Sequence, residues 1–178
     1  MKKLSRITLT GVAAIVMVTT LAACGGGNSG AQTPSSAPTT SAPVVVQASG
    51  AFNSIVTLPS GVAFTLNKQA VFTPTKFSAG QIDGQRFNSF EITAKNGAKT
   101  PLDLSALILT ATTVNAGACV DIFDGQIGIS GSPSDPIAPG ASITFKWALS
   151  CAGKAGDPLN ISLTTDGVTN VDVKDKLI

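Results

Sequence analysis

The sequence of 178 residues predicts an all-β fold, an immunoglobulin-like antiparallel β-sandwich of about seven strands. Three observations predict this fold class. Apolar residues in the last two thirds of the chain recur with a period of two, as in strands with one buried face. Pairs of turn-forming residues separate these runs. No segment has the periodicity of an amphipathic helix. About seven short strands in roughly 120 residues therefore favour two packed sheets.

The first 23 residues have the pattern of a secretory signal. Lys2, Lys3 and Arg6 form a positive start, and an uncharged, mostly apolar stretch follows over residues 7–21. As a helix this stretch would rise about 22 Å, less than the ~30 Å hydrocarbon core of a bilayer. A cleaved signal is therefore favoured over a permanent transmembrane helix.

The signal ends in Leu-Ala-Ala-Cys, which resembles the lipobox, where the cysteine thiol receives a diacylglycerol before cleavage. We therefore expect residues 1–23 to be removed and Cys24 to become a lipidated first residue carrying acyl chains such as palmitate. Two or more chains give stable anchoring, at about 0.8 kcal/mol per buried CH₂. The predicted location is the cell membrane, on its extracytoplasmic face, with the membrane as one partner. The alternative is an ordinary secretory cleavage site beside a chance cysteine.

A tether follows the signal. Residues 25–43 contain only Gly, Ser, Thr, Ala, Pro, Asn and Gln, so they cannot form a core and should be disordered. All nine aromatic residues lie from Phe52 onward, so folding should begin between Val44 and Phe52. The predicted organisation is a signal over residues 1–23, the lipidated cysteine and tether over 24–50, and the sandwich over 51–178.

Four runs alternate clearly between apolar and polar residues. Their predicted buried positions are Val62, Phe64, Leu66, Ala70 and Phe72 in the first, Phe90, Ile92 and Ala94 in the second, Ile143, Phe145, Trp147 and Leu149 in the third, and Leu159, Ile161 and Leu163 in the fourth. The segment 104–114 alternates less cleanly. It is interpreted either as a strand buried on both sides or as a short helical turn followed by a strand.

Turn signals lie between these runs. They are Asn96-Gly97, Gly131-Ser132-Pro133, Pro139-Gly140, Asp157-Pro158 and Asp166-Gly167.

Two cysteines remain once Cys24 is lipidated. In an extracytoplasmic domain, Cys119 and Cys151 are expected to form a disulfide. The bridge would close a loop of 33 residues, for which chain entropy predicts about 3.7 kcal/mol of stabilisation. A redox-active pair is the alternative, but no Cys-x-x-Cys motif is present.

Several short motifs together resemble one family. They are Phe72-Thr73-Pro74, the strand Phe87–Ala94 running into Asn96-Gly97 and Pro101-Leu102-Asp103, the segment Cys119–Asp124, and Ile137–Ser142 leading into Phe145-Lys146-Trp147. In this order they are similar to the DUF4352-type immunoglobulin-like lipoproteins of actinobacteria, over about residues 60–165. The second cysteine, Cys151, departs from the family pattern. The resemblance implies a β-sandwich on a lipid anchor and supplies no catalytic motif.

Composition excludes several function classes. The chain contains no His, which removes Ser-His-Asp and Cys-His mechanisms and imidazole metal sites. Without Lys2, Lys3 and Arg6, nine basic residues face ten acidic ones, so no charge pattern for nucleic acid is present. Asp121, Asp124 and Asp135 offer oxygen ligands but lack the spacing of a Ca²⁺ loop. Glu91 is expected on the solvent face of its strand. No metal, no cofactor and no catalytic residue is predicted.

The sequence favours a non-enzymatic binding or structural module whose partner is an envelope protein or a glycan. One alternative is a hydrolase of cell-wall polysaccharide that uses two carboxylates about 5–10 Å apart. Another is a carrier of a small apolar ligand between the sheets. The bulky side chains expected in the interior argue against the carrier; they are Phe64, Phe72, Phe90, Phe145 and Trp147.

Trp147, the one Trp of the chain, could have a structural or a functional role, and its predicted position decides between them. It is in phase with Ile143, Phe145 and Leu149, so it is predicted to lie in the core between the sheets. The alternative is an exposed Trp in a carbohydrate- or peptide-binding patch.

Overall fold

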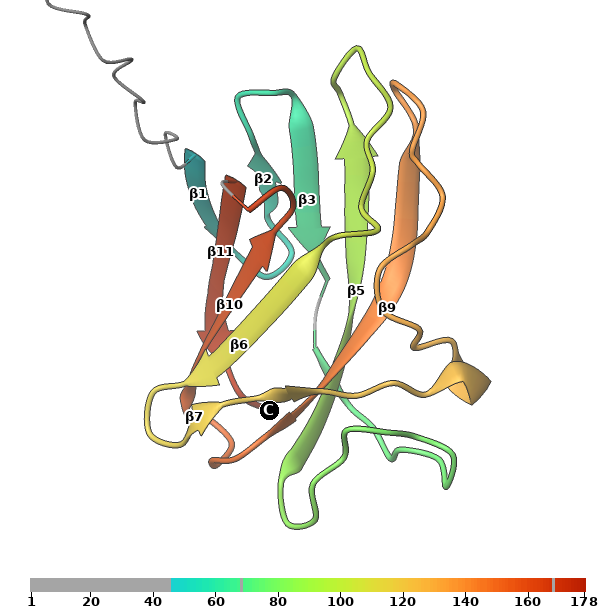
Figure 1. The fold of residues 1–178 in the computed structure, drawn as a ribbon. Coiled ribbons are helices and arrows are strands. Elements are labelled where there is room, and N and C mark those ends of the chain that lie inside the picture. Colours follow the sequence, from blue (N-terminus) through green and yellow to red (C-terminus); the bar gives the residue numbers. More distant parts are fainter. Residues whose placement is uncertain (1–45, 68, 168) are drawn as a thin grey trace, which may run out of the picture. The chain divides into compact units, whose positions relative to one another are not determined.

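The structure, a computed structural model, describes residues 46–67, 69–167 and 169–178, which form two packed β-sheets (Figure 1). The predicted signal, Cys24 and the tether as far as residue 45 lie outside the described residues. Within the described part, no helix is long and apolar enough to cross a membrane.

The first sheet has five strands in the order β1-β11-β10-β6-β7. Their bounds are Val46–Ala51 for β1, Thr169–Lys176 for β11, Pro158–Thr164 for β10, Ile108–Thr113 for β6 and Gly117–Ala118 for β7. Strands β11, β10, β6 and β7 pair in antiparallel fashion, whereas β1 runs parallel to β11.

The second sheet has six strands and follows the order β2-β3-β5-β9-β8, with β4 paired to β5. The bounds are Ile55–Thr57 for β2, Val62–Leu66 for β3, Ala70–Val71 for β4, Arg86–Asn96 for β5, Ser142–Cys151 for β9 and Val120–Asp121 for β8. All its pairings are antiparallel. A single 3₁₀ turn, η1, covers Gly125–Ile127 of the described chain.

The core lies between the inner faces of the two sheets. Phe64, Ile92 and Leu163 have no exposed surface there, and Trp147 is 5% exposed. Since burying one such side chain contributes about 1.5–3 kcal/mol, this layer supplies most of the favourable free energy of folding. The prediction that Trp147 is a core residue is confirmed.

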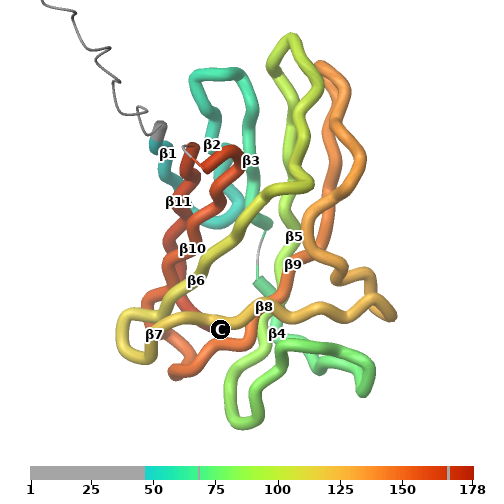
Figure 2. The backbone as a smooth tube through the Cα atoms, viewed as in Figure 1, coloured from blue at the N-terminus to red at the C-terminus, as the bar shows by residue number. Residues whose placement is uncertain are grey.

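A second group of buried residues covers the outer face of β5 and β9. We call it the outer cluster: Ile122, Ile129 and Ala148 are buried, with Phe72 and Phe87 packed against them. It explains why β9 alternates at its start but is buried on both faces from Trp147 to Cys151. The segments 72–85 and 122–133, which pass over this end of the sheet, are seen beside β4 and β8 in Figure 2.

The predicted fold class, an all-β two-sheet sandwich, is confirmed. The described residues form eleven strands, of which seven contain five or more residues. Two details need correction. The sandwich is not wholly antiparallel, because β1 pairs with β11 in parallel. Residues 46–50, assigned from the sequence to the tether, belong to β1, because their pairing partner lies at the far end of the chain and leaves no local signal.

The run from Val62 to Phe72 is not one strand. β3 ends at Leu66, and Gln69 is then buried while Ala70 is exposed, so the phase reverses before β4. Ala70 and Phe72 therefore do not share the inward face of Phe64, and Phe72 packs in the outer cluster instead. The change of phase lets the buried Gln69 side chain donate from Nε2 to the carbonyl of Lys176 at 3.0 Å, while its Oε1 stays buried without a hydrogen-bond partner among the described residues.

The segment 104–114 is a turn followed by a strand, in outline the second of the two interpretations given for it. A turn closes where Leu107 N donates to the Leu104 carbonyl at 2.9 Å, and β6 follows. One face of β6 is buried and the other is exposed, so a strand buried on both sides is wrong.

Candidate functional site

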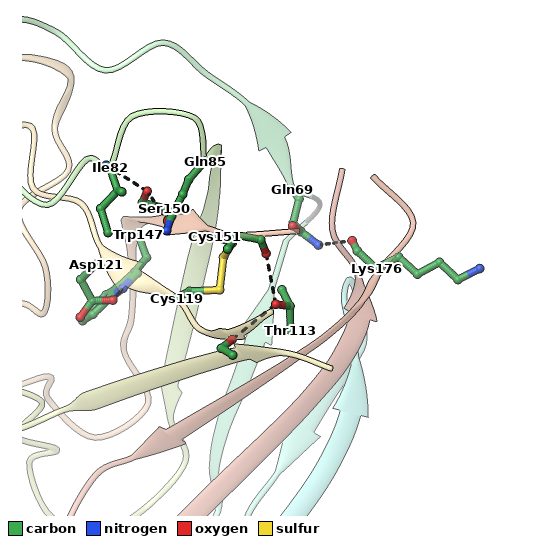
Figure 3. The surroundings of a disulfide bond; sticks show 12 residues. Gln69, Ile82, Gln85, Thr113, Cys119, Asp121, Trp147, Ser150, Cys151 and Lys176 are labelled. Atoms are coloured by element: carbon green, nitrogen blue, oxygen red, sulfur yellow. Dashed lines mark hydrogen bonds between the residues drawn. A yellow bond between two sulfur atoms is a disulfide. The ribbon is translucent and has the colours of Figure 1, made fainter. Parts of the chain in front are cut away.

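The predicted disulfide is present between Cys119 and Cys151, whose Cα atoms are 4.4 Å apart (Figure 3). Cys119 lies where the chain passes from β7 in the first sheet to β8 in the second, and Cys151 ends β9. The bond therefore fixes the crossing between the sheets. A structural disulfide of this kind is typical of proteins that fold in an oxidising compartment and supports an extracytoplasmic location.

Next to this crossing a groove of about 290 Å³ lies between the edges of the two sheets. We call it the edge groove. Its walls are Leu107–Leu109 on the side of β6, Asp121 and Phe123 on the side of β8, Trp147 from β9, and residues 130–132. It opens here because β8 is only two residues long and pairs with the end of β9, which leaves the start of β6 without a facing strand.

Among the residues that the structure describes, Asp121 is the one charged residue that lines the edge groove. It is half-buried, and its Oδ1 accepts a hydrogen bond from Trp147 Nε1 at 2.9 Å, a pair seen beside the disulfide in Figure 3. Desolvation by burial raises the pKa of this carboxyl, while the bond from Trp147 partly opposes the rise. Trp147 is thus both a core residue and one wall of the groove.

The rim of the edge groove is apolar. Ile108 is 59% exposed and Phe123 is 48% exposed, and they lie on opposite walls. An exposed aliphatic and an exposed aromatic side chain around one carboxylate make a surface that can hold an apolar group beside a cation or a hydrogen-bond donor.

Hydrogen bonds between distant segments hold the Phe123 wall in place. Asp124 is fully buried and accepts from Thr75 N at 2.7 Å and from the Thr75 hydroxyl at 2.9 Å. Phe123 and Ala79 exchange two backbone hydrogen bonds, of 2.8 and 2.9 Å. Backbone bonds between Asp124 and Ile129 close the loop around η1. The groove wall is therefore a fixed part of the fold.

Ser150 ties the outer face of β9 to the preceding loop. Its hydroxyl accepts from Ile82 N at 3.2 Å and donates to Gln85 Oε1 at 2.8 Å (Figure 3).

The acidic residues considered from the sequence are not brought together. Asp121 bonds Trp147, Asp124 bonds Thr75, and Asp135 is exposed. Among the described residues no group of three metal-ligating side chains occurs. Glu91 is exposed on β5 opposite Lys146, as predicted.

A second cavity, of about 250 Å³, contains two carboxylates, those of Asp103 and Asp166. Each is held by its own turn. Asp103 accepts from Ser105 N at 2.8 Å, and bonds from Ser105 lower the pKa of its carboxyl. Asp166 accepts from the backbone N–H and the hydroxyl of Thr169. Both are turn-capping residues of a common kind.

Sequence reasoning missed the edge groove. Ile108 begins β6, whose sequence does not alternate cleanly between apolar and polar residues, and Phe123 lies in an irregular segment. The sequence does place Phe123 two residues after Asp121, but nothing in it shows that these two residues lie next to β6.

Comparisons with known proteins bear on the fold. No protein-family model matches the chain, and no curated protein sequence matches it significantly. Among solved structures, ycdA of Bacillus subtilis, a presumed lipoprotein, is similar with a TM-score of 0.54 at 14% identity, over 65% of this chain. The chain spans 36% of the length of ycdA. This likeness shows a shared fold.

Two further structures resemble the chain more loosely. The secreted protein MPT63 of Mycobacterium tuberculosis has a TM-score of 0.47 at 13% identity, over 77% of this chain and 100% of its own. An uncharacterized β-sandwich protein of Clostridium difficile has a TM-score of 0.45 at 13% identity, over 75% of this chain and 97% of its own. The family resemblance drawn from the sequence stays a prediction.

Proposed function

We propose that this protein is a lipoprotein of the extracytoplasmic face of the cell membrane, and that its sandwich is a non-enzymatic binding module whose ligand site is the edge groove. The anchor is inferred from the signal pattern and Cys24, and the motifs similar to DUF4352-type lipoproteins of actinobacteria agree with it. A tether of Gly, Ser, Thr and Pro carries the module away from the lipid headgroups.

The observation that carries the binding role is the composition of the edge groove. It joins two exposed apolar side chains, Ile108 and Phe123, to a half-buried carboxylate, Asp121, on walls fixed by a disulfide and by hydrogen bonds to the buried Asp124. Apolar side chains around a partly desolvated charge offer a ligand both a surface for apolar contact and one charge-specific contact, a composition typical of interaction sites.

The two alternative functions receive less support. Hydrolysis by a carboxylate pair needs two carboxyl groups beside the bond that breaks, and one carboxylate lines the edge groove. In the second cavity both Asp103 and Asp166 are engaged by their turns. A carrier needs space between the sheets, where Phe64, Ile92 and Leu163 are fully buried.

The anchor is tested by metabolic labelling with a fatty-acid analogue. The wild type should be labelled and Cys24→Ser should not. The double variant Cys119→Ala/Cys151→Ala is the matched control and should keep its label, because its Cys24 is intact. Labelling that persists in Cys24→Ser would contradict lipidation.

The binding role is tested by photo-cross-linking on intact cells. A photoreactive amino acid is placed at Ile108, at Phe123, or at Ile55, which is 73% exposed on β2 and serves as control. Discrete adducts from positions 108 and 123, absent from 55, are expected. Equal labelling from all three positions, or none from the groove, would overturn the proposal.

A further inference from the structure

One edge of β6 is open at the edge groove. β6 pairs with β10 along its whole length, from Ile108 opposite Thr164 to Thr113 opposite Leu159. On its other side, β7 pairs only with Thr112 and Thr113. Within the described part of the chain, the first half of β6 therefore pairs with a strand on one side only.

The hydrogen-bond pattern identifies which backbone groups face the groove. In an antiparallel ladder, alternate residues bond to a given neighbour. Val114 N donates to the Pro158 carbonyl, so Thr112, Thr110 and Ile108 bond to β10. The bond from Leu177 N to the Asp157 carbonyl agrees with this assignment, because it places the intervening residues of β10 toward β11 and leaves Pro158, Asn160 and Ser162 facing β6. The residues between them, Leu109, Ala111 and Thr113, direct their N–H and C=O groups away from β10.

Two of these three residues have partners on that side. Thr113 lies opposite Gly117 of β7, and the Ala111 carbonyl accepts from Cys119 N at 2.8 Å. Leu109 lines the edge groove, and among the described residues no loop or side chain hydrogen-bonds to its N–H or C=O. An unpaired donor and acceptor on a strand edge are a template for another strand.

We propose that the ligand of the edge groove is an extended polypeptide segment, which adds to β6 through the backbone of Leu109 and places a Lys or Arg side chain against Asp121. This inference rests on the proposed function and names its partner class. Charge complementarity selects the cation, because Asp121 is the sole charged residue among the described residues that line the groove. The bond from Trp147 Nε1 orients one of the two Asp121 oxygens. Side chains next to the cation would contact Ile108 and Phe123.

The geometry of an added strand makes the proposal specific. Side chains of a strand alternate between faces, and its N–H and C=O groups alternate between edges. Once the cationic side chain faces Asp121, one of the two peptide edges must face Leu109. Methylation of backbone nitrogens on that edge should abolish binding, and methylation on the other edge should not.

The test begins with a random dodecapeptide library selected on immobilised, detergent-solubilised full-length protein. An enriched peptide is then titrated while the fluorescence of Trp147, the one Trp of the chain, is followed. We expect enriched peptides to share a Lys or Arg between apolar residues. Asp121→Asn should weaken their binding at least tenfold. Glu91→Gln removes an equal charge from the exposed face of β5 and should leave binding unchanged.

Two N-methylated forms of the enriched peptide, modified on alternate residues, complete the test. Loss of binding for one form and retention for the other would support strand addition. The modification is made on the peptide and not on the protein, because Leu109→Pro would also remove the side chain of a core residue that is 5% exposed.

The outcomes separate this inference from the proposed function. Peptides that bind Asp121→Asn as well as the wild type, or tolerate both methylation patterns, would overturn strand addition. No enriched peptide, together with adducts to a glycan from positions 108 and 123, would overturn the peptide partner and leave the binding module in place. Absence of adducts from the groove would remove the proposed function itself.

Discussion

The inter-sheet core and the outer cluster are buried by different means. In the core, strands of both sheets contribute alternating apolar residues, and large side chains such as Phe64 and Leu163 fill the space. The outer cluster has three buried apolar residues among those described, and hydrogen bonds hold the segments that cover it. These bonds join Asp124 to Thr75, Ser150 to Gln85, and the backbone of Phe123 to that of Ala79. Apolar area stabilises the first region, and specific hydrogen bonds position the second.

This difference matters because the edge groove is built from both regions. Leu109 and Trp147 belong to the core, whereas Phe123 belongs to the segment fixed by hydrogen bonds. A substitution in the core should therefore lower the stability of the whole sandwich. A substitution in the hydrogen-bonded segment should act on one wall of the groove.

The largest effect is expected for Trp147→Ala. The side chain is 5% exposed and contacts the core, so its removal should cost about 3–5 kcal/mol of unfolding free energy. Denaturant unfolding followed by circular dichroism measures the loss. In the wild type, Trp147 emission should be blue-shifted and resist iodide. Phe77→Ala, at a position 64% exposed, is the control and should change stability by less than about 0.5 kcal/mol. Free quenching of Trp147 in the folded protein would contradict its burial.

Removal of the disulfide should have the next largest effect. The double variant Cys119→Ala/Cys151→Ala is expected to lose about 2–4 kcal/mol, because its unfolded chain is no longer cross-linked. Unfolding of wild type and variant with and without reductant measures this loss, and only the wild type should respond to reductant. Peptide mapping under non-reducing conditions that finds both thiols free in protein from the envelope would show the bond to be absent in vivo.

A smaller and more local effect is expected for Asp124→Ala. The variant removes a fully buried carboxylate and leaves the N–H and hydroxyl of the half-buried Thr75 without their acceptor, which should cost about 1–3 kcal/mol. Amide hydrogen exchange should rise at Thr75 and Ala79 and stay unchanged in β10. Asp135→Ala, at an exposed aspartate, is the matched control. Uniformly faster exchange across both sheets would show that Asp124 supports the whole fold.

The comparison also explains which parts of the fold could be predicted. Period-two patterns identified β5, β9 and β10, because local sequence determines strand formation and phase. The interval predicted for the start of the fold, from composition and the position of the aromatic residues, included Val46. β1 was assigned to the tether, since its parallel pairing with β11 is a contact between the two ends of the described chain. The break after Leu66 was missed because Gln69 is buried through a bond to Lys176, far along the sequence.

The candidate site was less accessible to sequence reasoning than the fold. The disulfide was predicted from composition, because two cysteines allow one pairing. The edge groove was not, because its walls come from β6, β8 and β9 and are aligned by tertiary hydrogen bonds. Trp147 was assigned to the core alone, whereas its Nε1 also directs Asp121 toward the groove. Periodicity shows which face of a strand a side chain lies on, but it does not show that a buried side chain such as Trp147 also makes a polar contact at a surface groove.

The smallest effect, and the one that links stability to the groove, is expected for Asp121→Asn. Burial raises the pKa of Asp121 above its ordinary value of 3.8, so the folded protein holds this proton more tightly than the unfolded chain. Stability should therefore fall as the pH rises from about 3.8 through the raised pKa, and stay constant above it. Asparagine carries no charge, and its oxygen can still accept the bond from Trp147. The variant should be as stable as the wild type or more stable at pH 7, by less than about 1 kcal/mol for this half-exposed group. The difference should vanish near pH 3, where the wild-type carboxyl is neutral. Paired denaturant titrations at pH 3 and 7 measure it. A variant that is less stable at pH 7 would show that the carboxylate stabilises the sandwich, and the half-buried position of Asp121 would then need no ligand to explain it.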